Sequence, residues 1–390
     1  MNNQISNTLI KNYKFVVDKY INYINYQKIN KTDFAFSNIK KSSPYARCFA
    51  IFGLYNFSFQ VLTEYEKDIL AFVVIKDLES YILHKYYPNE FYNYKAPSQL
   101  LNFSLTALYC LGRLNEYEKN LRLIIEPYLK INLESYFLNH KVFSSEPRSG
   151  NFAMFVAVIL IYARDWLNID TQNQINYWIE SHIKNLNDCN LWGNNDFYSQ
   201  FQSSYHQYEI FNYLKINIFD NKKLIRNIID LQDTEGHYGP YPGGGGCYDF
   251  DAIKILTLSD NNDNDIKKSI NIFAKKLIKE QNKNGGFSEA YQFYPLRLKS
   301  QIRFLLKIIS QKNIDNLIPV IKQYFYIMLK NPVLYNNHFC IYTSKRWSDS
   351  DLWNSWFRVL ALTNVILFLG NKELKINYKK IKFPGIGYSE

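Results

Sequence analysis

The stretch QDTEGHY at residues 232–238 decides the fold, because it recurs 49 residues later as QNKNGGF at residues 281–287. Both copies read Gln-x3-Gly-x-aromatic. The glycine supplies the positive φ of a tight turn where a helix ends, and the aromatic ring packs that turn onto the next helix. The leading glutamine is placed to hydrogen-bond a neighbouring repeat. A degraded third copy is DCNLWG at residues 188–193.

Outward from these turns, seven segments that mix small and large apolar residues start about 44 to 55 residues apart. The residues at or near their starts from which this period is measured are Tyr45, Leu100, Asn151, Tyr205, Asp249, Arg297 and Asp351. Between them lie amphipathic segments such as DIKKSINIFAKKLIKEQ at residues 265–281, where apolar residues recur at helical spacing. We therefore predict an all-α fold in one domain, 1–390: an α/α toroid of about six to seven helical hairpins around a central pocket.

Composition narrows the function classes. Hydrophobic residues make up 47% and charged residues 21% of the 390 positions, as in a globular protein. The net charge of +11 comes from scattered lysines without a dense basic run, which favours a solvated surface or an anionic substrate over nucleic acid. The five cysteines are dispersed, which suggests free thiols in a reducing compartment. The N-terminus lacks a signal-peptide core, and the most apolar stretch, residues 152–163, is too short to span a bilayer.

We accordingly expect a cytoplasmic protein without a transmembrane segment, a cofactor or a nucleic-acid partner. Its expected substrate is a small molecule or a glycan, with an anionic substrate as one alternative. In a ring, the starts of the inner helices and the loops before them face one mouth of the pocket. That geometry would gather Tyr45, Arg47, Arg148, Asn151, Tyr205, His206, Glu209, Asp249, Asp251, Arg297, Trp347, Asp349, Asp351 and Trp353. Unpaired buried charges are costly, so the recurrence of charge at this phase favours a pocket. The alternative for Asp249, Asp251 and Asp349 is helix capping.

The segment GPYPGGGGCYDFDA at residues 239–252 is the most distinctive in the chain. Consecutive glycines leave the backbone bare, so that main-chain N–H groups can approach a ligand, and the following helix start favours anions. The alternative is a simple flexible turn. Tyr248, at the start of the helix, is a further candidate for substrate binding.

The Gln-x3-Gly-x-aromatic pattern resembles the QW repeat of squalene and terpene cyclases and the matching repeat of protein prenyltransferase β subunits, all α/α toroids. The resemblance extends over residues 188–361 by motif and over the N-terminal half by period alone. Within it, Asp249-Phe250-Asp251-Ala252 resembles the DxDD motif of class II terpene cyclases, whose middle Asp donates a proton. The resemblance implies that Asp251 is the general acid and that Asp249 holds its geometry.

Three departures from these families matter. The fourth motif position is Ala252 rather than Asp, and the chain is shorter than the usual two-domain cyclases. The zinc ligands of the prenyltransferases are not reproduced, because Gly245 stands where the ligand Asp would be, near Cys247. We therefore expect no metal site.

Several side chains remain open to two interpretations. His206 is either a structural core residue or a general base that orients a carboxylate. Trp353 and Trp356 are expected to be core on one side and pocket wall on the other, where aromatic faces stabilise a carbocation or stack on a sugar. Glu289 is a secondary candidate.

Three functions follow as hypotheses. The first is a terpene-cyclase-like or prenyl-substrate enzyme in which Asp251 is the acid and arginines bind a diphosphate. The second is a carbohydrate-active toroid, namely a lyase, hydrolase or epimerase of an anionic glycan, that uses paired carboxylates with His206. The third is a toroid that binds a ligand without catalysis.

Overall fold

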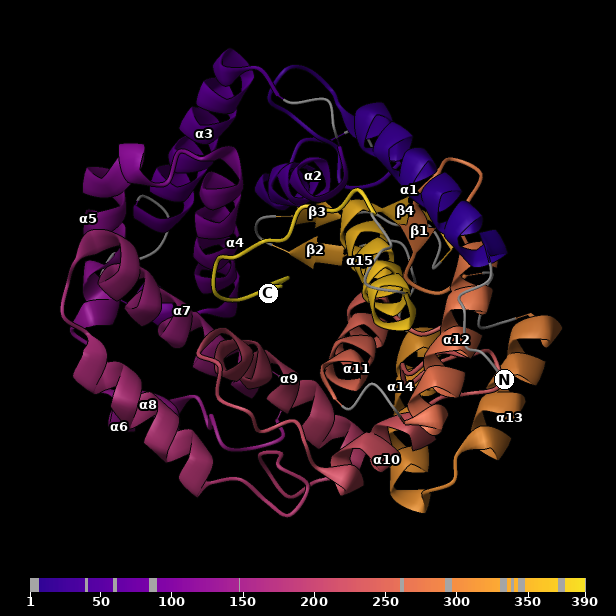
Figure 1. Cartoon of the computed structure of the whole chain (residues 1–390). Coiled ribbons are helices and arrows are strands. Elements are labelled where there is room, and N and C mark those ends of the chain that lie inside the picture. Colours follow the sequence, from indigo (N-terminus) through magenta and orange to yellow (C-terminus); the bar gives the residue numbers. More distant parts are fainter. Residues whose placement is uncertain are drawn as a thin grey trace.

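The computed structural model describes residues 7–38, 41–58, 62–83, 90–146, 148–259, 263–291, 297–329, 335–337, 340–342, 348–370 and 376–389. These residues form an α/α toroid, which confirms the predicted fold class (Figure 1). Six inner helices surround the centre: α2 (Pro44–Phe57), α4 (Lys95–Leu111), α7 (Ser149–Leu167), α9 (Phe197–Tyr213), α11 (Gly246–Leu258) and α15 (Leu352–Leu369). Six outer helices cover them: α1 (Asn7–Gln27), α3 (Glu64–Leu78), α5 (Glu118–Leu129), α8 (Gln172–Lys184), α10 (Lys222–Asp230) and α12 (Asn264–Lys279).

The repeated turns join neighbouring outer helices. Gln232, after α10, donates from its side-chain amide to the carbonyl of Ser269 in α12 at 2.9 Å. Gln281, after α12, donates to the carbonyl of Val16 in α1 at 2.8 Å. Since α1 is the first helix of the chain, the second contact closes the ring. Each turn is reversed by a glycine with φ +90°, as the pattern predicts.

Closure brings the first helix and the last helix together. The last inner helix, α15, packs between α1 and α12 and against α11 and α2. The hydroxyl of Tyr13 lies 3.1 Å from that of Thr363. Helices α7 and α15 are long and apolar enough to cross a membrane by length and composition, although 78% of each apolar window is buried inside the protein. They are therefore best described as the core helices of the ring. Helix α7 is also longer than the apolar stretch, residues 152–163, that the sequence analysis identified.

One predicted inner helix lies elsewhere. The segment that begins at Arg297 forms α13 (Leu298–Ser310), which lies outside the inner circle (Figure 1). The next helix, α14 (Ile314–Leu329), packs against α13 and against the inner helix α9. Because α15 packs directly against α11, no position remains between them for α13. Of the seven predicted inner helices, the described structure thus places six in the ring.

Short segments cover the ring on its two sides. The antiparallel pair β2 (Tyr335–Asn337) and β3 (Cys340–Tyr342) crosses the centre behind the inner helices, and residues 376–389 cross it in front (Figure 1). In this C-terminal segment, Phe383 packs on Tyr109 and Trp166, at the ends of α4 and α7. A second short pair joins β1 (Phe287–Ser288) to β4 (Ser350–Asp351), directly before α15. The remaining elements are α6 (Leu133–Asn139) and the single turns η1 (Glu79–Leu83), η2 (Phe91–Asn93) and η3 (Asn115–Tyr117).

Candidate active site

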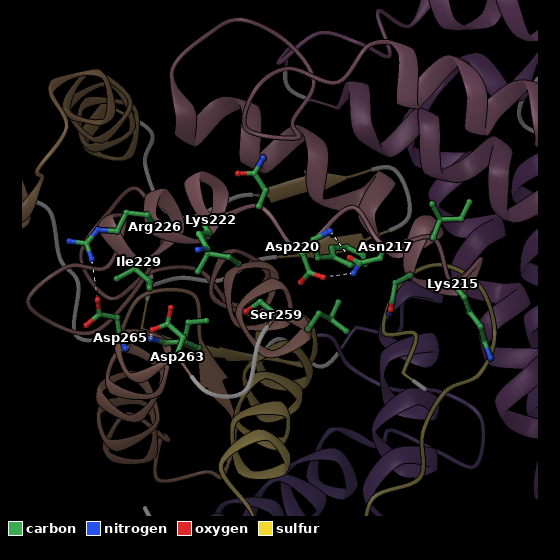
Figure 2. A pocket seen from close by; sticks show the side chains of 16 residues that line it. Lys215, Asn217, Asp220, Lys222, Arg226, Ile229, Ser259, Asp263 and Asp265 are labelled. Atoms are coloured by element: carbon green, nitrogen blue, oxygen red, sulfur yellow. Dashed lines mark hydrogen bonds and ion pairs between the residues drawn. The ribbon is translucent and has the colours of Figure 1, made fainter. Parts of the chain in front are cut away.

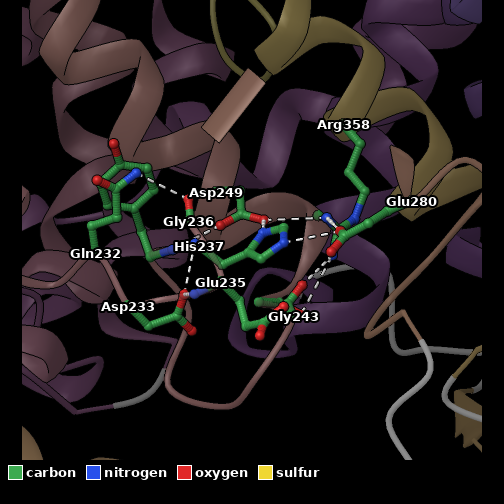
Figure 3. Close-up of polar contacts among 12 residues, drawn as sticks. Gln232, Asp233, Glu235, Gly236, His237, Gly243, Asp249, Glu280 and Arg358 are labelled. Atoms are coloured by element: carbon green, nitrogen blue, oxygen red, sulfur yellow. Dashed lines mark hydrogen bonds and ion pairs between the residues drawn. The ribbon is translucent and has the colours of Figure 1, made fainter. Parts of the chain in front are cut away.

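A buried network of charges holds the first carboxylate of the DFDA segment (Figure 3). Asp249, in the first turn of α11, accepts hydrogen bonds from His237 Nδ1 at 2.8 Å and from the Tyr238 backbone amide at 2.9 Å. His237 Nε2 lies 2.9 Å from Glu280, and Arg358 Nη1 lies 3.3 Å from Asp249. Two cations therefore face two carboxylates, which offsets much of the cost of burying them.

The imidazole in this network is charged. Burial alone would lower the pKa of His237, but Glu280 and Asp249 outweigh burial and raise it to about 10. His237 and Arg358 both contact the side chain of Asp249, so its hydrogen-bonding positions are occupied. Asp249 is thus suited to fix the start of α11 rather than to donate a proton.

The glycine-rich loop is shaped around this carboxylate. A Cβ on Gly244 would lie 2.8 Å from both carboxylate oxygens of Asp249, and Gly244 has φ +60°. Arg358 Nη2 donates to the carbonyl of Gly243 at 2.7 Å. The close approach that the glycines permit is therefore to the protein's own Asp249 and Arg358.

Asp251, one half-turn further along α11, has different surroundings. Its side chain is buried, and it makes no hydrogen bond or ion pair with any part of the chain that the structure describes. Burial, then the neighbouring carboxyl of Glu209, then Asp249, raise the pKa of Asp251 well above its usual range. These causes favour the neutral acid, whose O–H is available for donation.

Glu209 is a second buried acid on the adjacent inner helix, α9. One of its oxygens accepts from Tyr205 Oη and from the Gly387 backbone amide, each at 3.1 Å. Its other oxygen is buried without a hydrogen-bond partner among the described residues. Burial raises the pKa of Glu209 to about 8. Through Gly387, the C-terminal segment contacts the acids inside the ring.

Two cations lie where α4 and α7 begin. Lys95 is the first residue of α4, and Arg148 directly precedes α7 with φ 85°. Burial, and then Arg148, lower the pKa of Lys95 to about 8. Neither side chain has a hydrogen-bond or ion-pair partner in the described part of the chain. His206 is close to Lys95, and burial followed by Lys95 lowers the pKa of His206 to about 3, so that its imidazole is neutral.

Aromatic rings connect these groups across the ring interior. The ring centroid of Phe49 lies 5.0 Å from that of Trp353, and the ring centroid of Trp353 lies 5.3 Å from that of Phe357. Phe357 in turn lies 5.4 Å from Phe250, the residue between the two aspartates. Tyr205 and Phe103 extend the same wall. Phe250, which lies between the two aspartates in the sequence, thus belongs to an aromatic wall inside the ring.

We use the name central cluster for the polar and aromatic side chains around Asp251 at the inner faces of α4, α9, α11 and α15. The central cluster comprises Lys95, Tyr198, Tyr205, His206, Glu209, Cys247, Tyr248, Asp251 and Trp353. Of the predicted site residues, it contains Asp251, His206, Tyr205, Tyr248 and Trp353, with Asp249 and Arg148 at its edge.

Other predicted residues lie elsewhere. Arg47 points outward from α2 to Asp33, at 2.7 Å, and to Asp77, where it joins the first repeats. Arg297 is exposed before α13, outside the ring. Asp351 is the N-cap of α15 and accepts from the Asn354 amide at 2.7 Å. Asp351 therefore caps α15, a role that the sequence analysis considered for Asp249, Asp251 and Asp349 but not for Asp351.

Of the remaining candidates, Asp349 is half-buried in the turn before β4, Trp356 is fully buried in the core, and Trp347 lies outside the described residues. Glu289 accepts from the hydroxyl of Tyr241, and burial raises its pKa.

Sequence reasoning missed His237, Glu280 and Arg358. A signal existed for two of them, because His237 lies within the first copy of the repeated turn and Glu280 directly precedes the second. Arg358 lies within an otherwise apolar helix, α15, where its pairing with residues of other repeats depends on the closed ring.

A separate groove of about 1320 Å³ opens at the other end of α11 (Figure 2). Its walls come from α9, α10, α11 and α12 and the loops between them. Basic and acidic side chains alternate along it, and Arg226 pairs with Asp265 at 3.3 Å. The groove is open and mixed in charge, unlike the buried acids of the central cluster.

Comparison with solved structures places the fold among known toroids. The chain resembles variants of the type II terpene cyclase MstE from Scytonema in complex with geranylgeranyl dihydroxybenzoate. One has a TM-score of 0.52 and 11% identity over 94% of this chain and 99% of that chain. Another has a TM-score of 0.51 and 11% identity over 93% and 98%. An apo variant has a TM-score of 0.50 and 12% identity over 93% and 99%.

The identities are low, so this likeness shows the fold. No protein-family model matches the chain, and no curated protein matches its sequence.

Proposed function

We propose that the protein is a terpene-cyclase-like enzyme that starts the cyclisation of an isoprenoid by protonating an alkene with Asp251. The observation that carries this proposal is the contrast between two aspartates on one helix turn. Asp249 is contacted by His237 and Arg358, whereas Asp251 is buried without a hydrogen-bond or ion-pair partner among the described residues and favours its neutral form. Environments that separate two neighbouring carboxyl groups in this way assign one to acid chemistry.

The proposed step moves one proton. The O–H bond of Asp251 breaks as a new C–H bond forms at one alkene carbon, and the other carbon becomes a cation. A neighbouring alkene then attacks that cation to close a ring, and loss of a proton from the final cation yields a product isomeric with the substrate. The rings of Phe250, Phe357 and Trp353 are placed to stabilise the cation through their π faces.

The polar end of the substrate is assigned to Lys95 and Arg148. Both cations lack an acidic partner among the described residues, and both lie at helix starts, where anions are favoured. A carboxylate or phosphate head group would neutralise them. Arg47 is paired elsewhere and Arg297 is outside the ring, so neither is available to a diphosphate or to an anionic glycan, and Arg148 is the arginine that remains for the head group.

The test is turnover of geranylgeranyl dihydroxybenzoate or geranylgeranyl diphosphate by the purified chain. We expect a product of unchanged mass in H₂O that gains one deuterium in D₂O, because the proton of Asp251 exchanges with solvent. Asp251→Asn should reduce the rate at least about a hundred-fold, since the amide is a far weaker acid. Mass spectrometry and chromatography report both results.

The matched control is Asp220→Asn in the open groove, which should leave turnover unchanged. Circular dichroism would establish that both variants are folded. Full turnover by Asp251→Asn would remove this residue from the acid role. Binding of the isoprenoid without any turnover would instead favour the non-catalytic toroid.

A further inference from the structure

Helix α13 carries its apolar face on the outside of the molecule. Leu298 and Ile309, at its two ends, are 72% and 77% exposed. Between them, Ile302, Leu305 and Leu306 continue the same face at helical spacing and are also exposed. Scattered exposed apolar residues are normal on a protein surface, but a continuous stripe along a helix is not.

The opposite face of α13 fixes this orientation. Lys307 is fully buried and lies 3.2 Å from the carboxylate of Asp233 in the repeated turn. Arg303, one turn earlier, donates to the carbonyl of Tyr291 at 3.0 Å. Lys312, just after the helix, pairs with Asp230 at 3.0 Å. The polar face of the helix is therefore turned inward by specific contacts, which leaves the apolar face outward.

The neighbouring helix α14 extends the apolar surface. Ile314 and Leu329, at its ends, are 80% and 85% exposed, and Ile318 and Phe325 are exposed between them. The two helices are held together by Phe304 and Tyr324, whose rings stack at 3.7 Å. We use the name apolar face for these exposed side chains of α13 and α14: Leu298, Ile302, Leu305, Leu306, Ile309, Ile314, Ile318, Phe325 and Leu329.

The charged residues around the apolar face indicate what kind of surface it contacts. Residues 297–329 contain six basic residues and one acidic residue, Asp315. Three of the basic residues are exposed around the apolar face: Arg297, Lys299 and Lys322. Apolar side chains ringed by lysine and arginine are typical of helices that lie in the interface of an anionic membrane. A second copy of the chain would instead bring two basic rims together.

We propose that the apolar face of α13 and α14 docks the protein on an anionic lipid bilayer. Helices of 13 and 16 residues are too short to span the bilayer, so they lie in its plane with the apolar face among the acyl chains. The inference stands apart from the proposed reaction, because docking requires neither Asp251 nor turnover.

The test uses the full chain and sedimentation with vesicles of phosphatidylcholine, with or without about 30% phosphatidylglycerol. We expect the protein to bind the anionic vesicles and to bind them more weakly at high salt. Binding to the neutral vesicles should also be weaker than binding to the anionic ones. The double variant Leu305→Asp/Ile309→Asp should bind the anionic vesicles at least about ten-fold more weakly, because it places charge in the apolar face. Lys322→Gln should reduce the binding by a smaller factor.

The control is Leu123→Asp/Leu138→Asp, which changes two exposed leucines on α5 and α6 and should bind vesicles as the wild type does. Equal weakening in both double variants would overturn the proposal, as would absence of wild-type binding to anionic vesicles. Light scattering adds an independent readout. A wild-type dimer that Leu305→Asp/Ile309→Asp converts to a monomer would show that a second copy, not lipid, covers this face.

Discussion

At the scale of single residues, the interior of the ring separates acids by their surroundings. Asp249 is enclosed by cations, whereas Asp251 and Glu209 have lost water and gained no cation within hydrogen-bonding distance among the described residues. The neutral form of each of these two acids is therefore favoured in the fold. Such groups make stability depend on pH.

The raised pKa of Glu209 determines how stability should change with pH. Its pKa rises from 4.5 to about 8 on folding, so the folded chain binds more protons than the unfolded chain between these values. The stabilising contribution is complete below pH 4.5 and is lost as the pH rises through about 8. Glu209→Gln stays neutral at every pH, and we expect its free energy of unfolding to fall less than that of the wild type between pH 4.5 and pH 8.

Urea denaturation at the two pH values measures this difference. Glu126→Gln serves as the control, because Glu126 forms an exposed ion pair with Lys130 on α5 and should follow the wild type. Identical pH slopes for Glu209→Gln and the wild type would show that Glu209 is ionised in the fold.

At the scale of elements, α13 shows how a helix can be held outside the ring by its polar side. The buried pair of Lys307 and Asp233 attaches it to the turn that follows α10. Removing one partner of a buried pair leaves the other charge unpaired, at a cost of about 3–5 kcal/mol. The unpaired charge should therefore destabilise α13 and α14 rather than the inner helices of the ring.

We therefore expect Lys307→Met to loosen α13 and α14 locally while the ring stays folded. Limited proteolysis should cut within residues 297–329 faster than in the wild type, with little change in helical circular dichroism. Lys312→Met removes an exposed pair, worth at most about 1 kcal/mol, and should be cut at the wild-type rate. A global loss of helicity in Lys307→Met would contradict local opening.

At the scale of the whole molecule, the ring closes through the turn that begins at Gln281. A Cβ on Gly285 would lie 2.1 Å from the carbonyl oxygen of Lys19 in α1, and Gly285 has φ +90°. Gly285→Ala should therefore lower the free energy of unfolding by about 1–3 kcal/mol more than a glycine-to-alanine change that adds backbone strain without a clash. Thermal or urea unfolding measures the difference.

Gly112→Ala is the matched control, because Gly112 has φ +70° and nothing within 4 Å of an added Cβ. Both variants share the strain of a positive φ, and only Gly285→Ala forces α1 away from the turn. Equal destabilisation of the two variants would mean that α1 does not rest on this glycine.

The difference between local turns and contacts that join separate repeats explains which features the sequence predicts. The repeated turns are local, so their glycines and the contacts of Gln232 and Gln281 could be predicted from spacing. Helical spacing in α13 indicated an apolar face but not what covers it, and the helix was wrongly placed inside the ring. Likewise, the contacts of His237 with Glu280 and of Asp249 with Arg358 join different repeats, and only closure brings them together.

The meeting of α1 with α15 also has a consequence for synthesis. Tyr13 and Thr363 are 350 residues apart, so a ribosome that adds about 5–20 residues per second needs roughly 20 to 70 seconds to make both. Throughout that interval the apolar side of α1 lacks its final partner. Faster elongation shortens the period in which this side of α1 is exposed to aggregation before the last helix emerges.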